Sequence, residues 1–294
     1  MSDYVQQHHN LSNFTGEDSW VILSDIEQSI KRKIEAAGTP LKEWDINIYR
    51  GILTGFNDAF VISTEKRDEI LASCKTDDER ERSASIIRPI LRGRDIKRYG
   101  HDWSNLWLIN THNGVKGQIP RIHIEDYPAI KAHLDMFWEK IKKRADKGDT
   151  PYNLRNCAYL EDFDKPKIMY PNMTKYIPFY YDEMKFIQND KSFMITGNHI
   201  AYLTAFLNSS LFKFCFLDNF PELQGGTREL RKIFFDKIPV LKVSDSENEA
   251  FEKLVRNIQQ SYSIGVAKEI DERIFELYGL SQEEKDTIGF IEIV

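Results

Sequence analysis

The 294-residue sequence predicts an α+β fold, with a mixed sheet and a helical hairpin at its C-terminal end. Short apolar runs bounded by Pro and Asn-Asp turns dominate residues 150–198, which is typical of strands. Residues 244–288 instead show the apolar spacing of helices. We expect three regions: an N-terminal connector with a short helix at residues 1–40, a central α+β region at residues 41–243 and a C-terminal helical region at residues 244–294.

The first predicted element is a short amphipathic helix. Ser24 and Glu27 match a capping box, in which each side chain accepts a hydrogen bond from a backbone N–H of the other residue. Isoleucines then recur on one helical face, and Gly38 followed by Pro40 ends the helix.

Two strands and a helix are expected next. Trp44–Tyr49 alternates apolar and polar residues as a strand does. Glycines and an Asn-Asp pair favour turns, so we expect a tight loop at Gly51–Asn57 and a returning strand at Ala59–Ile62. Thr64–Lys75 has helical apolar spacing, and Asp77–Arg82 is predicted to be a charged, exposed connection.

The middle of the chain combines one long helix with several strands. Leu106–Ile109 is a short apolar strand, followed by a polar loop. Asp126–Lys147 is predicted to be a helix, because Pro128 suits its first turn and apolar side chains form a stripe along it. Further strands are predicted at Lys167–Tyr170, Phe179–Tyr181 and Ser192–Ile195.

Helices close the chain. Asn198 is expected to cap a long apolar helix that is interrupted at residues 208–210. Ser244 starts a helix through a second capping box, and another helix follows it up to Gly279, so the two predict a helical hairpin. One last short helix is expected to begin at Ser281.

The net charge of −6 is concentrated at one end of the chain. Residues 244–294 hold 12 acidic and 5 basic side chains, a net charge of −7, so the rest of the chain is nearly neutral. The three cysteines are odd in number and far apart, so neither a disulfide framework nor a Cys-x-x-Cys metal site is expected. No apolar run approaches the roughly 20 residues of a membrane helix, and Met1–Asn13 lacks the apolar core of a signal peptide. We therefore expect a cytoplasmic protein without a membrane partner.

The motifs of several enzyme classes are missing, so no catalytic or metal-binding residue is assigned. None of the ten prolines is next to another, which excludes the Pro-Pro tetrapeptide of amine methyltransferases, and no P-loop, Gly-x-Ser-x-Gly or His-Glu-x-x-His motif is present. A metal-dependent nuclease stays open as an alternative. Asp164 with Glu183 and Lys185 matches a loose pattern whose carboxylates could hold a metal ion near a scissile phosphate.

The segment Ile86–Tyr99 carries five basic side chains against Asp95 alone, and glycines break it, so it does not form a plain helical face. One interpretation is a solvated surface paired with the acids of Asp77–Glu81. The other is a DNA-binding surface, because Arg, Asn and Gln can read base edges while Lys and backbone amides hold phosphates. Polar loops accompany the segment and favour the second interpretation. The candidate DNA-binding residues are Arg50, Thr54, Asn57, Arg88, Arg92, Arg94, Lys97, Arg98, His112, Asn113, Lys116, Arg155, Asn156, Asn172, Lys175, Thr227 and Arg228.

Together, five segments in the same order resemble the TaqI-like C-terminal specificity domain: Arg50–Phe60, Ile87–Ile96, Lys167–Tyr170, Tyr202–Ser209 and Ile270–Leu280. The resemblance covers about residues 20–288 and implies the target-recognition part of adenine-N6 DNA methyltransferases and of fused type IIG restriction-modification enzymes. It implies that double-stranded DNA is bound by loops in the major groove. It also implies an N-terminal or separate methyltransferase or nuclease domain, with S-adenosylmethionine bound in the methyltransferase, which flips the adenine out.

The family resemblance turns residues 41–243 into an expected DNA target recognition domain. Thr54 and Asn57 are then expected to face DNA, while Arg88–Arg98 anchors its backbone. Because the catalytic part of the family is missing here, no cofactor and no catalysis are expected of this chain alone. A third interpretation stays open, in which the acidic hairpin Ser244–Leu280 makes the chain a protein-interaction subunit of a DNA-modification complex.

Overall fold

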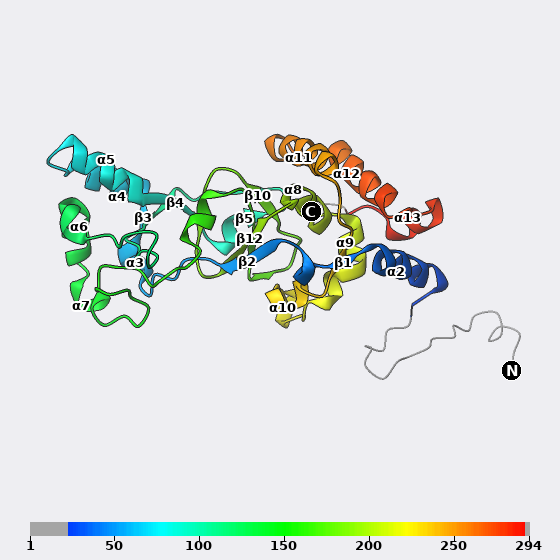
Figure 1. The fold of residues 1–294 in the computed structure, drawn as a ribbon, viewed down its shortest axis with the longest axis horizontal. Coiled ribbons are helices and arrows are strands. Elements are labelled where there is room, and N and C mark those ends of the chain that lie inside the picture. Colours follow the sequence, from blue (N-terminus) through cyan, green and yellow to red (C-terminus); the bar gives the residue numbers. More distant parts are fainter. Residues whose placement is uncertain (1–22, 292–294) are drawn as a thin grey trace, which may run out of the picture. The chain divides into compact units, whose positions relative to one another are not determined.

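The computed structural model describes residues 23–291, and these form two compact units (Figure 1). The central unit comprises Asp45–Ile200 and Pro221–Arg231, and the described part of the terminal unit comprises residues 23–44, Ala201–Phe220 and residues 232–291. Residues 201–220 and 232–243 therefore pack with the C-terminal helices and not with the central region in which the sequence placed them. The predicted α+β class is confirmed, because helices accompany both antiparallel and parallel strand pairs. The connector residues 1–22 lie outside the described residues.

The first sheet of the central unit is antiparallel and has the strand order β10-β8-β12-β2. Its strands are β2 (Ile46–Arg50), β8 (Lys167–Pro171), β10 (Tyr180–Asp182) and β12 (Ser192–Gly197). Met194 of β12 lies opposite Tyr49 of β2 on one side and Met169 of β8 on the other. The strands predicted between residues 167 and 195 are thus confirmed, and they form one sheet with the strand predicted at Trp44–Tyr49.

The second sheet of the central unit is mixed and has the strand order β11-β4-β7-β3. Its strands are β3 (Val61–Ser63), β4 (Ile87–Leu91), β7 (Leu106–Ile109) and β11 (Ile187–Gln188), and its helices are α3 (Asn57–Phe60), α4 (Thr64–Ala72), α5 (Asp77–Ile86), α6 (Pro128–Asp135) and α7 (Trp138–Ile141). β11 runs parallel to β4, whereas β7 is antiparallel to both neighbours. The core forms between sheet and helices, where Phe60, Leu108 and Ile130 are fully buried.

The predicted returning strand at Ala59–Ile62 is wrong in its position and its partner. Ala59 and Phe60 belong to the single helical turn α3, and the strand begins only at Val61. β2 pairs with β12 while β3 pairs with β7, so the two strands belong to different sheets. Turn-forming residues predicted a hairpin, but the chain instead crosses from one sheet to the other.

Two further predictions are corrected by long-range contacts. Asp77–Arg82 lies within α5 and is not a connection, because Thr76 caps the helix and the buried carboxylate of Glu79 accepts from the N–H of Ala129 at 3.0 Å. The helix predicted at Asp126–Lys147 breaks after α6 and ends with α7 at Ile141. The chain then turns, and the side chain of Arg144, which follows α7, lies in the interior.

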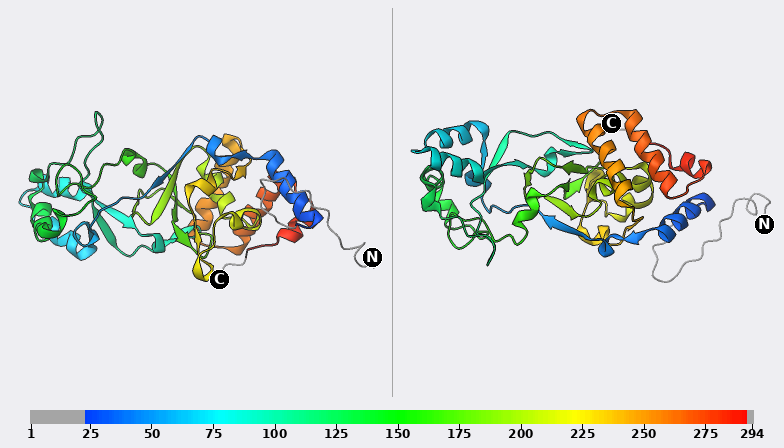
Figure 2. Two further views of the ribbon diagram at one scale, coloured as in Figure 1. Left: turned by 90° about the horizontal axis from the view of Figure 1, so that it is seen from below. Right: turned by 45° about the horizontal axis from the view of Figure 1, so that its top comes forward.

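The terminal unit is built from helices that the sequence largely predicted. They are α2 (Asp25–Ala37), α8 (Ile200–Leu207), α9 (Ser210–Phe216), α10 (Lys232–Phe235), α11 (Asp245–Gln260), α12 (Ile264–Leu277) and α13 (Gln282–Ile288). α11 and α12 lie side by side as the expected hairpin (orange in Figure 2, right). Both bonds of the capping boxes at Ser24 and Ser281 are present.

Short elements complete both units. Two-residue strands are β1 (Thr39–Pro40), β5 (Ile96–Lys97), β6 (Gly100–His101), β9 (Met173–Thr174), β13 (Arg228–Glu229) and β14 (Pro239–Val240), and 3₁₀ turns lie at Leu41–Glu43, Gly93–Asp95, Ile124–Asp126, Leu160–Asp164, Leu217–Asn219 and Gln224–Gly226. Over the described residues, no single helix has the length and apolar character to cross a membrane. Among residues 23–291, one pair of helices, Ile200–Leu207 with Ser210–Asn219, reaches that length and apolar character together, but it is bent by 67°.

Glu284 joins α13 to α2 and should make stability depend on acidic pH. Its carboxylate accepts from Lys33 Nζ at 2.6 Å, Ser29 Oγ at 2.8 Å and Ser281 N at 2.7 Å. Burial alone would raise the pKa of Glu284, but these hydrogen bonds lower it from 4.5 to about 2. The stabilisation is therefore fully present above pH 4.5 and is lost as the pH falls towards 2.

Glu284→Gln is expected to lower the free energy of unfolding by about 2 kcal/mol at neutral pH and by little at the acidic limit. Urea denaturation over a series of pH values measures both numbers. Glu283→Gln is the matched control, because Glu283 is exposed and lies in the first turn of the same helix. A pH-independent loss in Glu284→Gln would contradict the prediction.

Candidate nucleic-acid interface

The turn at residues 189–191 brings several candidate segments of the central unit together. The N–H of Asn189 donates to the carbonyl of Leu91 at 3.1 Å, which holds the turn against the end of β4. The N–H of Asn172 donates to the carbonyl of Lys191 at 2.8 Å, which holds the end of β8 against the other side of the turn. The candidate segments that follow β4 and β8 are therefore neighbours in space.

Arg50 and Arg92 flank this turn, and both have acidic partners. Arg50 Nε donates to the carbonyl of Asp190 at 2.8 Å, and its guanidinium lies 3.3 Å from the carboxylate of the same residue. Arg92 makes two hydrogen bonds to the carboxylate of Asp95, at 2.9 and 2.8 Å. Burial would raise the pKa of Asp95, but its hydrogen bonds with Arg92 keep it below the usual value. The guanidinium of Arg92 thus holds the turn after β4, and its contact with DNA stays a prediction.

Three other cations near the turn have exposed charged groups. Arg94 lies in the 3₁₀ turn after β4, and Lys175 follows β9; neither side chain has a hydrogen bond or ion pair within residues 23–291. Lys191 is 72% exposed and lies 3.7 Å from a carboxylate oxygen of Asp190. A Cβ added to Gly93 would lie 2.8 Å from the carbonyl oxygen of Lys191, so the Arg94 turn and Lys191 are in contact. Of these three, the sequence missed Lys191, which no local pattern distinguishes from other surface lysines.

Lys97 and Arg98, the next basic residues of the Ile86–Tyr99 segment, contact other residues of that segment. Lys97 Nζ lies 3.8 Å from the carboxylate of Asp102 and donates to the carbonyl of Arg94 at 3.0 Å. The guanidinium of Arg98 lies 5.4 Å from the ring centre of Tyr99. The exposed ammonium group of Lys97 therefore lies beside the Arg94 turn, whereas Arg98 packs on its neighbour Tyr99.

Arg88 pairs with Asp164, one of the two carboxylates on which the nuclease interpretation depends. Its guanidinium donates to the carboxylate of Asp164 at 2.7 Å and to the carbonyl of Lys185 at 3.0 Å. Throughout the described part of the chain, no group of three or more His, Cys, Asp or Glu residues could hold a metal ion. The pattern of Asp164, Glu183 and Lys185 therefore gains no support from the geometry.

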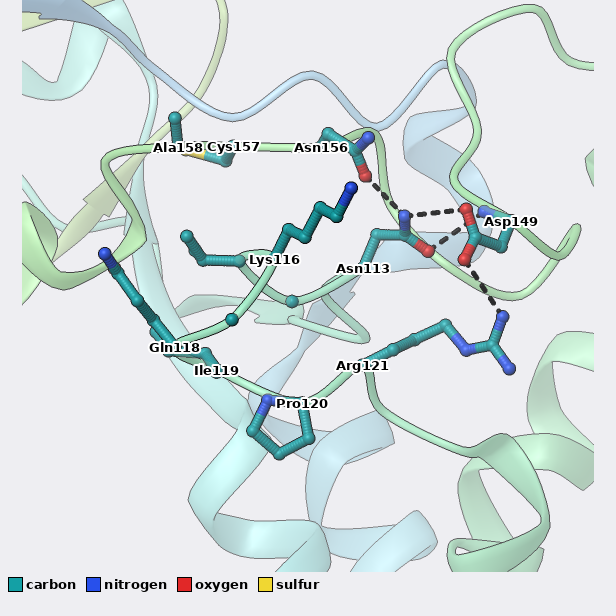
Figure 3. A pocket seen from close by; sticks show the side chains of 13 residues that line it. Asn113, Lys116, Gln118, Ile119, Pro120, Arg121, Asp149, Asn156, Cys157 and Ala158 are labelled. Atoms are coloured by element: carbon teal, nitrogen blue, oxygen red, sulfur yellow. Dashed lines mark hydrogen bonds and ion pairs between the residues drawn. The ribbon is translucent and has the colours of Figure 1, made fainter.

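A groove of about 750 Å³ gathers a second set of candidates (Figure 3). It is lined by residues 113–121, 149 and 156–158. Asn113 Nδ2 donates to the carboxylate of Asp149 at 3.0 Å and to the amide oxygen of Asn156, and its own oxygen accepts from the N–H of Asp149 at 2.9 Å. Asn113 and Asn156, predicted to contact DNA, thus fix the wall of the groove.

Lys116 supplies the exposed charge of this groove, and its ammonium group points across it towards Asn156 (Figure 3). Among the residues described, the Lys116 side chain has no hydrogen bond or ion pair. His112 Nδ1 accepts from the N–H of Gly114 at 3.2 Å, and burial lowers the pKa of His112, so a neutral ring shapes the loop. Arg121 is held by Asp149 at 3.1 Å.

Of the two residues expected to face DNA, Asn57 is exposed at the start of α3, whereas Thr54 is not. Thr54 is buried, and its hydroxyl donates to the amide oxygen of Asn57 at 2.5 Å, where α3 begins. Arg155 is exposed and lies 3.2 Å from the carboxylate of Asp146. Arg155 is the one charged residue among Thr54, Asn57 and Arg155, and its guanidinium is accessible to DNA.

Arg144 holds these loops together, and the sequence missed it. It lies within the lysine-rich run after α7, but its side chain is buried and donates to the carbonyls of Thr54, Asp146, Pro151 and Asn153. Burial lowers the pKa of its guanidinium to about 10, so the group stays charged at neutral pH. No sequence signal separates it from the neighbouring solvent-exposed bases.

Thr227 and Arg228 lie on a narrow ribbon formed by β9 and β13. Arg228 pairs with Thr174 on one side and forms a β-bridge with Glu222 on the other. Its guanidinium lies 3.3 Å from the carboxylate of Glu222. The two candidates therefore follow directly after Gly225 and Gly226 in the chain.

Comparisons of this chain with known proteins identify a family and similar proteins. The family model of the TaqI-like C-terminal specificity domain matches residues 88–240. The type II methyltransferase M.PaeR7I of Pseudomonas aeruginosa is 20% identical over 279 residues, covering 93% of this chain and 45% of that protein. The structure of the type IIL restriction-modification enzyme MmeI in complex with DNA shares the fold, with a TM-score of 0.59 and 12% identity over 85% of this chain and 34% of that chain. The chain thus spans less than half the length of either relative.

Proposed function

The chain belongs to the family of TaqI-like C-terminal specificity domains, and from this premise we propose that it recognises a specific sequence in double-stranded DNA for an adenine-N6 methyltransferase. The observation that carries the proposal is a set of exposed cations: Arg94 and Lys191 at the turn of residues 189–191, and Lys175 on the loop after β9. Exposed cations on a loop surface neutralise phosphates, and polar side chains beside them can contact bases. Asn172, at the same turn, is such a side chain.

The methyltransferase itself is proposed to be another part of the same protein or a separate subunit. The relatives that contain a stretch similar to this chain are a methyltransferase and a restriction-modification enzyme, and both are more than twice its length. S-adenosylmethionine would then bind in that other part, as would any nuclease of the type IIG arrangement. This chain would supply the choice of site and no catalytic group.

Charge removal at the turn is expected to weaken DNA binding through phosphate contacts. The triple variant Arg94→Gln, Lys175→Gln and Lys191→Gln should bind a short fluorescein-labelled duplex of mixed sequence about tenfold or more weakly at low salt. The slope of log affinity against log salt should fall by about 2 to 3, since each phosphate contact contributes about 0.9. Fluorescence anisotropy over a salt series measures both quantities.

The matched control replaces three exposed lysines of the terminal unit, Lys42, Lys237 and Lys253, by glutamine. It removes the same charge from the chain, so a general effect of net charge would appear in both triple variants. Equal losses in both variants would reject the turn as the DNA-binding surface. Absence of duplex binding by the unmodified chain at low salt would reject the proposed function itself.

The protein-interaction alternative gains no particular support from the acidic hairpin. Asp271 of α12 is buried, and its carboxylate accepts from the N–H and hydroxyl of Ser210 at 2.9 and 2.5 Å. Arg273 and Glu247 pair at 3.2 Å between α12 and α11. Part of the acidity thus stabilises the terminal unit itself.

A further inference from the structure

The ribbon of residues 172–176 and 222–229 exposes large apolar side chains that a folded domain normally buries. Tyr176 is 71% exposed, Met173 is 53% exposed and Leu223 is 40% exposed. Met173 belongs to β9, and Tyr176 lies on the loop after it. Leu223 follows Glu222, which forms a β-bridge with Arg228 of β13. Such a concentration of apolar surface on a narrow element is typical of a binding site.

The tip of the ribbon permits a close approach by a partner. Gly225 and Gly226 have φ angles of +75° and +78°, in the left-handed region that glycine adopts without strain. A Cβ added to Gly225 would lie 3.9 Å from Lys175 Nζ, and a Cβ on Gly226 would meet nothing within 4 Å. The tip is therefore slender and carries a cation beside it.

The ribbon is also continuous with the cations of the turn. The N–H of Leu230, directly after β13, donates to the carbonyl of Asn172 at 2.8 Å, and the N–H of Asn172 donates to the carbonyl of Lys191 at 2.8 Å. An anionic partner held by Lys191 and Arg94 would thus meet the ribbon next. A wholly apolar protein surface would leave Lys175 at the edge without a counter-charge.

We propose that the ribbon enters a groove of the DNA duplex and that the ring of Tyr176 inserts at a base step, flanked by Met173 and Leu223. This inference rests on the proposed function and adds that the chain locally unstacks the duplex. A two-stranded ribbon fits the major groove, apolar wedges unstack base steps, and aromatic rings stack on bases of any type. Tyr176 suits this role because its side chain makes no hydrogen bond to other described residues, while its backbone is fixed by Thr174 Oγ1 at 3.1 and 2.7 Å.

The test uses the full chain and duplexes that it enriches from a library with a randomised centre. 2-Aminopurine is placed at each adenine position of the enriched duplex in turn, and its fluorescence rises where a base is unstacked. Wild-type chain is expected to raise the fluorescence at one or two neighbouring positions several-fold. Tyr176→Ala should abolish that rise and weaken binding about tenfold, whereas Tyr176→Phe should keep both.

Met136→Ala is the matched control, because Met136 is 67% exposed in the same unit but lies between α6 and α7, outside the ribbon. It should leave the fluorescence and the affinity unchanged. If the wild-type chain binds the enriched duplex but 2-aminopurine responds equally with wild type and Tyr176→Ala, the inference is wrong while the proposed function stands. If no duplex is enriched, the proposed function fails and the inference fails with it.

Discussion

Gly51→Ala is expected to lower the free energy of unfolding by about 3 kcal/mol or more, because the added methyl group has no space. A Cβ at this position would lie 2.0 Å from the carbonyl oxygen of Asn189 and 2.4 Å from that of Gln188. Both atoms belong to backbone that is itself fixed, since the N–H of Asn189 donates to Leu91 and Gly51 donates to Ser192 at 2.9 Å. The clash can be relieved only by moving one sheet of the central unit relative to the other.

Chemical denaturation followed by tryptophan fluorescence measures this loss, and hydrogen exchange locates it. Amides of residues 187–192 should exchange faster in Gly51→Ala than in the wild type, because they form the junction that the methyl group opens. Gly100→Ala is the control: a Cβ there meets nothing within 4 Å, and its free energy of unfolding should change by less than about 0.5 kcal/mol. Equal denaturation midpoints for the two variants would show that the backbone at residue 189 yields easily.

Gly51 illustrates which features the sequence could predict and which it could not. The family is confirmed by a match over residues 88–240, which does not include Arg50–Phe60, so the value of this segment as a family marker stays a prediction. Its geometry was misread, because the reason for Gly51 lies in Asn189, far along the chain. Local turn signals predicted a hairpin, whereas the glycine permits a close crossing between two sheets.

Helices of the terminal unit were predicted well because their signals are local. The capping boxes at Ser24 and Ser281 and the apolar spacing of α11 and α12 lie within a few residues of each other. α5 was missed for the opposite reason. Its charged sequence looks solvent-exposed, and only the distant N–H of Ala129 explains why Glu79 is buried.

Candidate contacts with DNA were the least predictable feature, since a basic side chain does not reveal its partner. Arg50 pairs with Asp190, which is 140 residues away, and Arg88 pairs with Asp164, which is 76 residues away. Arg92 and Asp95 are only three residues apart, so that pair could have been recognised as a turn-forming interaction. Within the basic segment Arg94 and Lys97 are exposed, and Lys191 of another loop contacts the Arg94 turn.

Arg144→Met is expected to cost about 3 to 5 kcal/mol of unfolding free energy, which is the second large effect. The substitution keeps an unbranched apolar stem but removes every donor to the carbonyls of Thr54, Asp146, Pro151 and Asn153. Buried carbonyls without a donor lose the hydrogen bonds they had with water in the unfolded chain. The loops that carry these carbonyls should therefore loosen before the rest of the central unit unfolds.

Two comparison variants test whether the loops are held by the several hydrogen bonds of the planar guanidinium or by its positive charge alone. Arg144→Lys keeps the charge, but an ammonium group is compact and cannot span four carbonyls, so it should recover less than half of the loss. Lys143→Met removes a charge from the neighbouring exposed position and should change the free energy of unfolding by less than about 0.5 kcal/mol. Denaturation midpoints rank the three variants. If Arg144→Lys matched the wild type, a buried charge and not the planar fork would hold the loops, and Arg144 would lose its role as their hydrogen-bonding centre.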